Sequence, residues 1–148
     1  MLTVSYHYTS GLLLTVFGFL ISYYFYQHGR GILPAKVSWL PSIVQIGDCR
    51  CEEIMNTRFG QTFGRSNAYW ALYYFSILFI LILTQWVWDR PGNVFIFIIT
   101  LLAFARSIYL AWALYILKVL CRPCITAHTI NLGLILLFGH LIWNQIFI

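Results

Sequence analysis

Apolar residues in this chain gather into long runs that are separated by short polar stretches. The first run extends from about residue 8 to residue 27 and ends at a His-Gly-Arg stretch that hydrocarbon would exclude. Three further runs follow, at about residues 67–88, 94–117 and 122–146. Each run is close to the roughly 20 residues that a helix needs to cross a bilayer. The pattern predicts an all-α integral membrane protein with four transmembrane helices.

The connections between the runs are unequal. Residues 89–93 read as a tight turn in which Pro91 stops a helix, so the second and third spans are expected to be neighbours. Residues 28–65 form a much longer loop that carries two prolines, eight charged residues and two cysteines. Its apolar residues predict a segment that rests on the membrane surface or caps the helix bundle, with Trp39 at headgroup depth. These apolar residues are Val37, Trp39, Leu40, Ile43, Val44 and Ile46.

Composition supports this picture and excludes others. Hydrophobic residues make up 61% of the 148 positions and charged residues 9%, against about 45–50% and 25% in soluble domains. The net charge of +5 is scattered and does not form the dense stripe that nucleic-acid binding requires. No Lys or Arg precedes the first run, so it lacks the charged start of a cleavable signal peptide. We therefore expect this run to stay in the protein as a membrane span. We expect one membrane domain over residues 1–148 and no nucleic-acid partner.

The span count also places the four cysteines. The loop after the first span, the start of the second span and the start of the fourth span all emerge on the same membrane surface. Cys49, Cys51, Cys121 and Cys124 are therefore expected at one face. This prediction depends only on the number of crossings.

The sequence Cys121-Arg122-Pro123-Cys124 opens the fourth apolar run. Cysteines three positions apart at a helix start can form a disulfide, and Pro is favourable in the first turn. The helix dipole, Arg122 and Lys118 all favour the thiolate form, which attacks disulfides and donates electrons. This pattern indicates redox chemistry at the membrane surface.

The loop pair Cys49 and Cys51 is separated by one residue, so its disulfide closes a small ring of the labile, exchangeable kind. Such a pair can accept electrons from a soluble dithiol and pass them to Cys121 by thiol–disulfide exchange. Electrons that reach Cys124 then need an acceptor. In a bilayer the abundant two-electron acceptor is a lipid-soluble quinone, which would lie beside the fourth span.

Polar residues near the helix starts are candidates for holding that quinone. His128 follows Cys124 by one helical turn, and Asn131 lies one turn further along the same face. Either His128 or Asn67 could bond a quinone carbonyl, although His128 could also bond a neighbouring helix and Asn67 could simply cap the second span. Arg106, in the third span without an acidic partner, is expected to bond His140, Asn144 or Gln85, or less readily a quinone or lipid.

Two other classes of function compete with a redox enzyme. Four thiols could bind or transfer a metal such as zinc. The cysteines could instead be inert packing residues of a membrane scaffold. Stoichiometric metal in the purified protein would favour the first alternative, and full function without any cysteine would favour the second.

Several sequence pieces together resemble the vitamin K epoxide reductase family of membrane thiol oxidoreductases. Their order and spacing are specific, and they run through most of the chain. They are Cys51 with residues 55–60, Phe63-Gly64, Ser66-Asn67, residues 107–112, residues 121–126 and Ile130-Asn131.

The resemblance implies a four-helix bundle around a quinone pocket, with the loop between the first two helices folded over it as a cap. By position, Cys124 resembles the cysteine that transfers electrons to quinone, and Cys121 its partner. Cys51 resembles the loop thiol that bonds Cys121, and Cys49 the outer thiol met by a thioredoxin-like protein. Asn67 falls at a quinone-binding Asn, and His128 where some members have a Tyr in that role.

The chain also departs from the family pattern. Relatives usually separate the loop cysteines by several residues, whereas Arg50 alone lies between them here. Many bacterial relatives carry a fused thioredoxin domain that this sequence lacks, so a separate thioredoxin-like dithiol protein is expected. The resemblance leaves open whether an epoxide or only a quinone is reduced. Of the two, we favour protein disulfide formation coupled to reduction of a menaquinone, ubiquinone or vitamin K type quinone.

Charge and chemistry predict opposite orientations of the protein in the membrane. Most of the basic residues fall on the cysteine face, and the positive-inside rule would place that face in the cytoplasm. Disulfide formation and the family's usual topology place it outside. We expect the extracytoplasmic face, with an inverted orientation as the alternative. The basic residues on this face are Arg30, Lys36, Arg50, Arg58, Arg65, Lys118 and Arg122.

Overall fold

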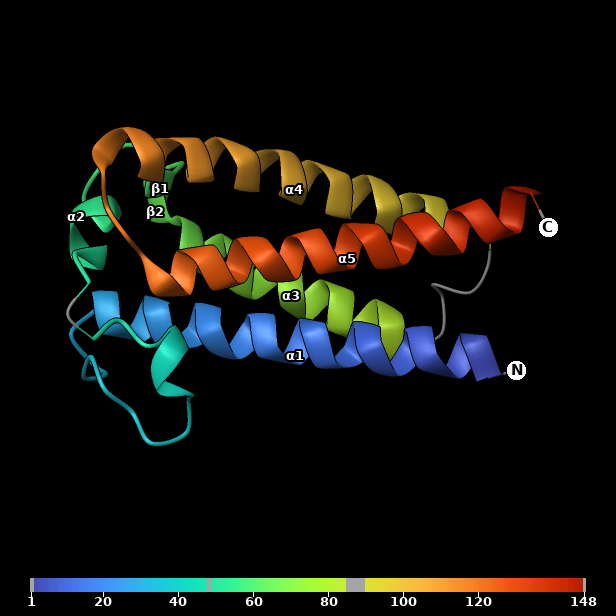
Figure 1. Cartoon of the computed structure of the whole chain (residues 1–148), viewed down its shortest axis with the longest axis horizontal. Helices are drawn as coiled ribbons and strands as arrows, with labels where there is room; N and C mark the ends of the chain where they lie inside the picture. The colour runs from blue at the N-terminus through green and yellow to red at the C-terminus, as the bar shows by residue number, and fades with distance from the viewer. Residues whose placement is uncertain (1, 48, 85–89, 148) are drawn as a thin grey trace.

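A computed structural model describes residues 2–47, 49–84 and 90–147 of the chain. Within these residues the fold consists of four long helices and a small cap (Figure 1). The long helices are α1 (Leu2–Gly29), α3 (Asn67–Leu83), α4 (Arg90–Leu117) and α5 (Arg122–Phe147). The cap, residues 30–66, holds the 3-10 helix η1 (Ser42–Val44), α2 (Cys51–Met55) and the hairpin strands β1 (Gln61–Thr62) and β2 (Arg65–Ser66).

The membrane character of the helices agrees with the sequence pattern. Helices α1, α4 and α5 are long and apolar enough to cross a bilayer. Helix α3 is apolar but is described over only 17 residues. The end of the predicted second span, including residues 85–88, lies outside the described residues. The helical membrane fold is therefore confirmed, and a crossing by α3 stays a prediction.

The long helices run alternately in opposite directions, and both ends of the chain lie at one end of the molecule (Figure 1). The cap, the start of α3 and the start of α5 lie at the opposite end. This arrangement brings the two cysteine-bearing segments to the same end, as the span count predicts.

Helix α4 corrects one predicted boundary. Residues 90–93 were expected to belong to a turn, but the helix already begins at Arg90. Pro91 therefore occupies the first turn, where the missing N–H costs no hydrogen bond and the fixed φ suits a helix. Asp89, the first residue of the predicted turn, lies outside the described residues.

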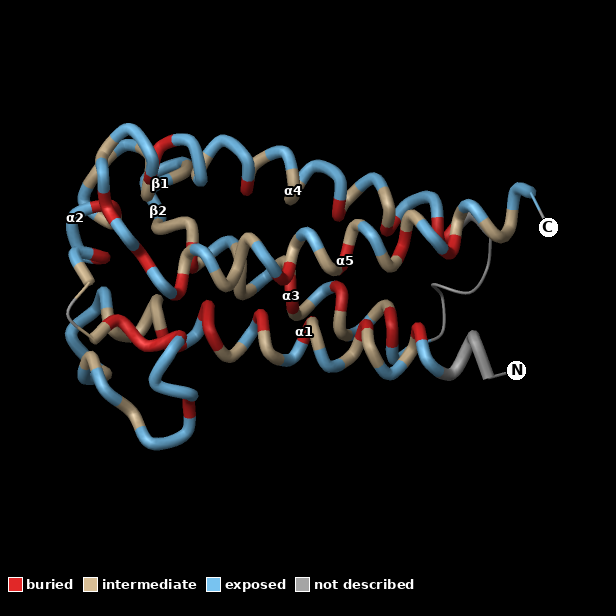
Figure 2. The backbone as a smooth tube through the Cα atoms, viewed as in Figure 1, coloured by how far each residue is buried: buried red, intermediate tan, exposed pale blue. Residues whose placement is uncertain are grey.

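Helix packing leaves an apolar outer surface and a buried interior, shown by the red positions in Figure 2. Helix α1 packs against α3 and α5, and α4 packs against α5. Gly18 allows the close approach of α1 and α3, because a Cβ atom there would collide with the buried ring of Phe75. Large apolar residues such as Leu13, Leu102 and Leu136 point outward, as expected for helices in lipid.

Two polar side chains fix the cap onto the bundle. The hydroxyl of Tyr24, on α1, donates to the Ala35 carbonyl over 2.6 Å and accepts from the Ile46 amide over 3.1 Å. The buried amide of Gln45 donates to the carbonyls of Val37 and Leu40, at 2.6 Å each. The loop is thus an ordered cap whose apolar residues Leu40, Val44 and Ile46 join the core, while Trp39 and Ile43 stay exposed.

Candidate redox and quinone site

The helix-start pair lies where α5 begins. Cys121 immediately precedes the helix, and its carbonyl accepts from the Ile125 amide over 3.0 Å. Pro123 is buried in the first turn, as the sequence predicts. Cys121 and Cys124 are joined in a disulfide, with Cα atoms 5.2 Å apart. Cys121 is fully buried, whereas Cys124 is half-buried.

The loop pair lies at the start of α2. Cys49 and Cys51 are also joined in a disulfide, with Cα atoms 5.4 Å apart. Cys51 is fully buried, and Cys49 is half-buried. Gly47, just before this pair, adopts φ +52°, and an atom at its Cβ position would lie 3.7 Å from Nη1 of Arg122. The cap therefore brings the chain beside the loop pair close to the residue between the helix-start cysteines.

Both pairs contact the hydrophobic core of the bundle. Cys51 and Cys121 belong to the same buried core cluster, and Cys49 and Cys124 pack against it. Each pair is closed on itself, so a bond between Cys51 and Cys121 is absent from this oxidised arrangement. Transfer between the pairs stays a prediction, and the approach of Gly47 to Arg122 is the observation that supports it.

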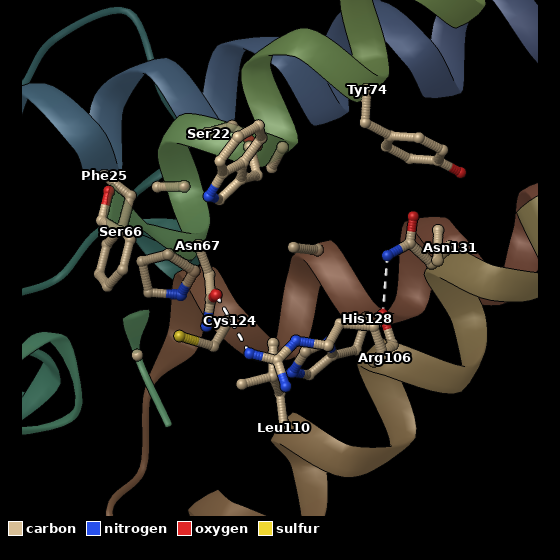
Figure 3. A pocket seen from close by; sticks show the side chains of 18 of the residues that line it. Ser22, Phe25, Ser66, Asn67, Tyr74, Arg106, Leu110, Cys124, His128 and Asn131 are labelled. Carbon is tan, nitrogen blue, oxygen red and sulfur yellow. Dashed lines mark hydrogen bonds between the residues drawn. The ribbon is translucent and has the colours of Figure 1, made fainter. Parts of the chain in front are cut away.

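A cavity of about 430 Å³ lies beside the helix-start pair and is bounded mainly by α3, α4 and α5 (Figure 3). Its walls are apolar and partly aromatic. Cys124 lies on the wall, together with both residues predicted to hold a quinone, Asn67 and His128. Other lining residues are Phe25, Trp70, Tyr74, Phe75, Arg106, Ser107 and Asn131.

Asn67 is held at the cavity by a polar network with the hairpin. Its Nδ2 donates to the Phe59 carbonyl over 2.7 Å, and its Oδ1 accepts from the Thr62 hydroxyl over 2.7 Å. Ser66 caps α3 by accepting from the Tyr69 amide over 3.3 Å. The structure therefore assigns the capping role to Ser66, and one N–H of the Asn67 amide is left for a ligand.

Arg106 has partners other than those predicted. Its Nη2 donates to the Thr62 hydroxyl over 2.8 Å and to Asn67 Oδ1 over 3.3 Å. His140 bonds His7 instead, over 3.0 Å, and contacts Asn144 at 3.4 Å. Gln85, the third predicted partner, lies outside the described residues. For His140 and Asn144 the prediction was wrong, because Arg106 reaches toward the cap end of α4, whereas these two residues lie near the far end of α5.

Several buried polar atoms around the cavity have no hydrogen-bond partner within the described structure. They are both ring nitrogens of His128, the Tyr74 hydroxyl and Oδ1 of Asn131. Nδ2 of Asn131 is used, since it donates to the Ser107 hydroxyl over 2.7 Å. Unpaired buried polar groups are costly, and their concentration at one cavity indicates a site for a ligand with polar edges.

Tyr74 is a site residue that sequence reasoning missed. It lies seven positions after Asn67, which is two helical turns, so both side chains fall on one face of α3. That spacing was a usable signal. It was hidden because α3 carries four other aromatic residues nearby, Tyr69, Trp70, Tyr73 and Phe75.

Comparison with known families shows which family the chain belongs to. The sequence profile of the vitamin K epoxide reductase family matches residues 11–138. The chain belongs to this family. No match is found among curated proteins. Family membership and the two cysteine pairs make the chain an integral membrane thiol oxidoreductase.

The cavity residues fit the quinone that the family implies. A pocket of this size is typical for a small organic ligand. Apolar and aromatic walls suit a flat ring, and Asn67, Tyr74 and His128 provide polar atoms for its carbonyl oxygens. In the described part of the chain, no group of three or more His, Cys, Asp or Glu residues is placed to hold a metal ion.

Proposed function

We propose that this family member couples formation of protein disulfides to reduction of a membrane quinone. The single observation that carries the proposal is the position of Cys124, which belongs to the disulfide at the start of α5 and also lines an apolar cavity. One sulfur atom thus connects thiol chemistry on one side with a ring-sized space on the other.

The reaction balances without a further reactant. A thioredoxin-like protein loses two electrons and two protons as its dithiol becomes a disulfide, and a quinone gains both as it becomes a hydroquinone. Half-buried Cys49 receives the attack of the partner protein, because Cys51 and Cys121 have no exposed surface. This attack releases the Cys51 thiolate, which then attacks Cys121. The Cys121–Cys124 disulfide opens, and Cys124 is left as the thiolate beside the cavity.

The chain's own residues orient the ring. The remaining N–H of Asn67 and the ring N–H of His128 would donate to the carbonyl oxygens of the ring, and the apolar walls would exclude water. A menaquinone, ubiquinone or vitamin K type ring supplies the two-electron chemistry when bound. The Tyr74 hydroxyl is a third group available to the ring edge.

The function is tested with purified protein in lipid nanodiscs, a reduced thioredoxin-like protein and a short-chain menaquinone. Quinone loss and disulfide appearance should proceed in a ratio of one to one. Dithiol oxidation that continues without quinone, or quinone turnover that leaves the dithiol reduced, would contradict the proposal.

Replacing His128 by leucine separates a binding role from a packing role. We expect the free energy of unfolding to rise by about 1–3 kcal/mol, because two unsatisfied buried nitrogens are removed. The KM for quinone should rise about tenfold, because one hydrogen bond to the ring is lost. Thermal unfolding and steady-state kinetics measure the two effects.

His140→Leu is the matched control on the same helix. His140 bonds His7 and does not line the cavity, so this variant should lose stability and keep the wild-type KM. If His128→Leu is also destabilised and keeps its KM, His128 has no role in holding quinone.

We propose that all four long helices cross the membrane with the cysteine end extracytoplasmic. The disulfide chemistry supports this orientation, and the charge distribution opposes it. A reporter joined after the C-terminal residues should then be active only in the cytoplasm, because both ends of the chain lie opposite the cap. A reporter that is active only outside would establish the inverted orientation.

A further inference from the structure

One charged side chain in the cavity is unexplained by the proposed function. Arg106, on α4, lines the apolar cavity beside Cys124 and His128 (Figure 3). The two hydrogen bonds of the Arg106 side chain are both donated by Nη2. They go to the Thr62 hydroxyl and to Oδ1 of Asn67, and both acceptors are neutral. An arginine has five N–H donors. Within the described residues, the donors on Nε and Nη1 have no acceptor.

Among the residues that the structure describes, no carboxylate balances the positive charge of Arg106. The sequence has four acidic residues, and the two that the structure describes are engaged elsewhere. Glu52 contacts His28 at 3.3 Å, and Glu53 pairs with Arg50, both on the outer side of the cap. The Arg106 guanidinium lies 4.9 Å from the centroid of the Tyr109 ring, which is a weaker form of compensation.

An unpaired charge in an apolar cavity is expensive, and a ligand of opposite charge removes much of that cost. A guanidinium with free N–H donors bonds an anionic oxygen more strongly than a neutral carbonyl. The walls determine the rest of the ligand. Phe25, Trp70 and Phe75 offer flat apolar surfaces that suit a ring better than a hydrated phosphate.

We propose that Arg106 makes this cavity selective for quinone-type rings that carry a negatively charged oxygen over neutral rings of the same size. This inference rests on the proposed function: the neutral membrane quinone enters this cavity, and an ionised ring of the same size binds there more tightly. Arg106 approaches the ring from the side of Asn67, so the charged oxygen lies at that end of the cavity. His128, one turn below Cys124, faces another part of the ring.

The test compares two ligands of nearly equal size. 2-Hydroxy-1,4-naphthoquinone is ionised at neutral pH, whereas 2-methyl-1,4-naphthoquinone is neutral. Binding of each is measured by titration calorimetry to the oxidised protein in zwitterionic nanodiscs, so no turnover is needed. The wild-type protein should bind the ionised ring more tightly.

Arg106→Met should weaken binding of the ionised ring by about tenfold to a hundredfold, the range of one charge-assisted hydrogen bond. Binding of the neutral ring should change by less than about threefold. Arg106→Lys should recover part of the selectivity, because the charge is kept and the planar fork is lost. Arg65→Met is the matched control. Arg65 pairs with Thr62, the hairpin residue that Arg106 bonds, but it does not line the cavity.

Equal weakening of both ligands in Arg106→Met would overturn the inference and leave Arg106 a structural role. Unchanged binding of both would also overturn it. The same titrations are repeated in nanodiscs rich in phosphatidylglycerol, an anionic lipid. If the wild-type protein no longer prefers the ionised ring there, a lipid headgroup occupies the site beside Arg106, and the assignment of a charged ring is overturned. Failure of the proposed function is scored separately, by the absence of quinone-dependent dithiol oxidation.

Discussion

Cys124→Ser is expected to reduce quinone-dependent oxidation of a protein dithiol to background. A serine cannot form the disulfide with Cys121 and has no thiolate to give electrons to the ring. No other thiol replaces it, because Cys124 is the one cysteine that lines the cavity within the described structure. The rate of quinone loss, followed by absorbance with a reduced thioredoxin-like protein, measures the effect.

Cys49→Ser provides a matched comparison for this result. Cys49 is half-buried at the loop pair and does not line the cavity. This variant should lose turnover with the protein partner but keep turnover with a small dithiol that can enter and reduce the inner pair directly. Wild-type rates in Cys124→Ser with either donor would contradict the mechanism.

The double variant Cys49→Ser with Cys124→Ser is expected to form a disulfide between Cys51 and Cys121 almost completely. These two thiols are then the only ones left in the chain. Both lie fully buried in one cluster, and the segment before Cys49 approaches Arg122. Two thiols buried at the same end of one molecule react with each other in preference to a thiol of another molecule, because the reaction is intramolecular. Mass spectrometry of the linked peptides, after oxidation in the intact membrane, measures the yield.

Cys49→Ser with Cys121→Ser is the control, because it leaves Cys51 with Cys124, which faces the cavity. Its linked product should be clearly less abundant. If neither double variant yields a linked product, the loop pair and the helix-start pair do not exchange, and the relay fails.

The main features of the fold follow from local sequence signals. The apolar runs predicted the helices because each run is long enough to satisfy its own backbone in lipid. The start of α5 was predicted from Pro123, and the shared face of Cys124, His128 and Asn131 from helical spacing. These predictions succeeded because they depend on residues within a few turns of each other.

The features that the sequence did not predict depend on contacts between distant segments. Arg106 bonds Thr62, which lies 44 positions earlier in a hairpin that the sequence presented only as loop. Likewise, Tyr24 holds the cap through Ala35 and Ile46, and neither bond leaves a periodic signal. Tertiary packing fixes such partners, so a single sequence could reveal that Arg106 needs compensation but not which residues provide it.

The alternating direction of the helices has a practical consequence for attaching the protein to a sensor surface. Both ends of the chain lie at the end of the bundle opposite the cap (Figure 1). The protein can therefore be immobilised through either end while its thiol end faces the solution. In that geometry, label-free binding measurements would record docking of the partner protein, because the immobilised end leaves free the face that the partner needs.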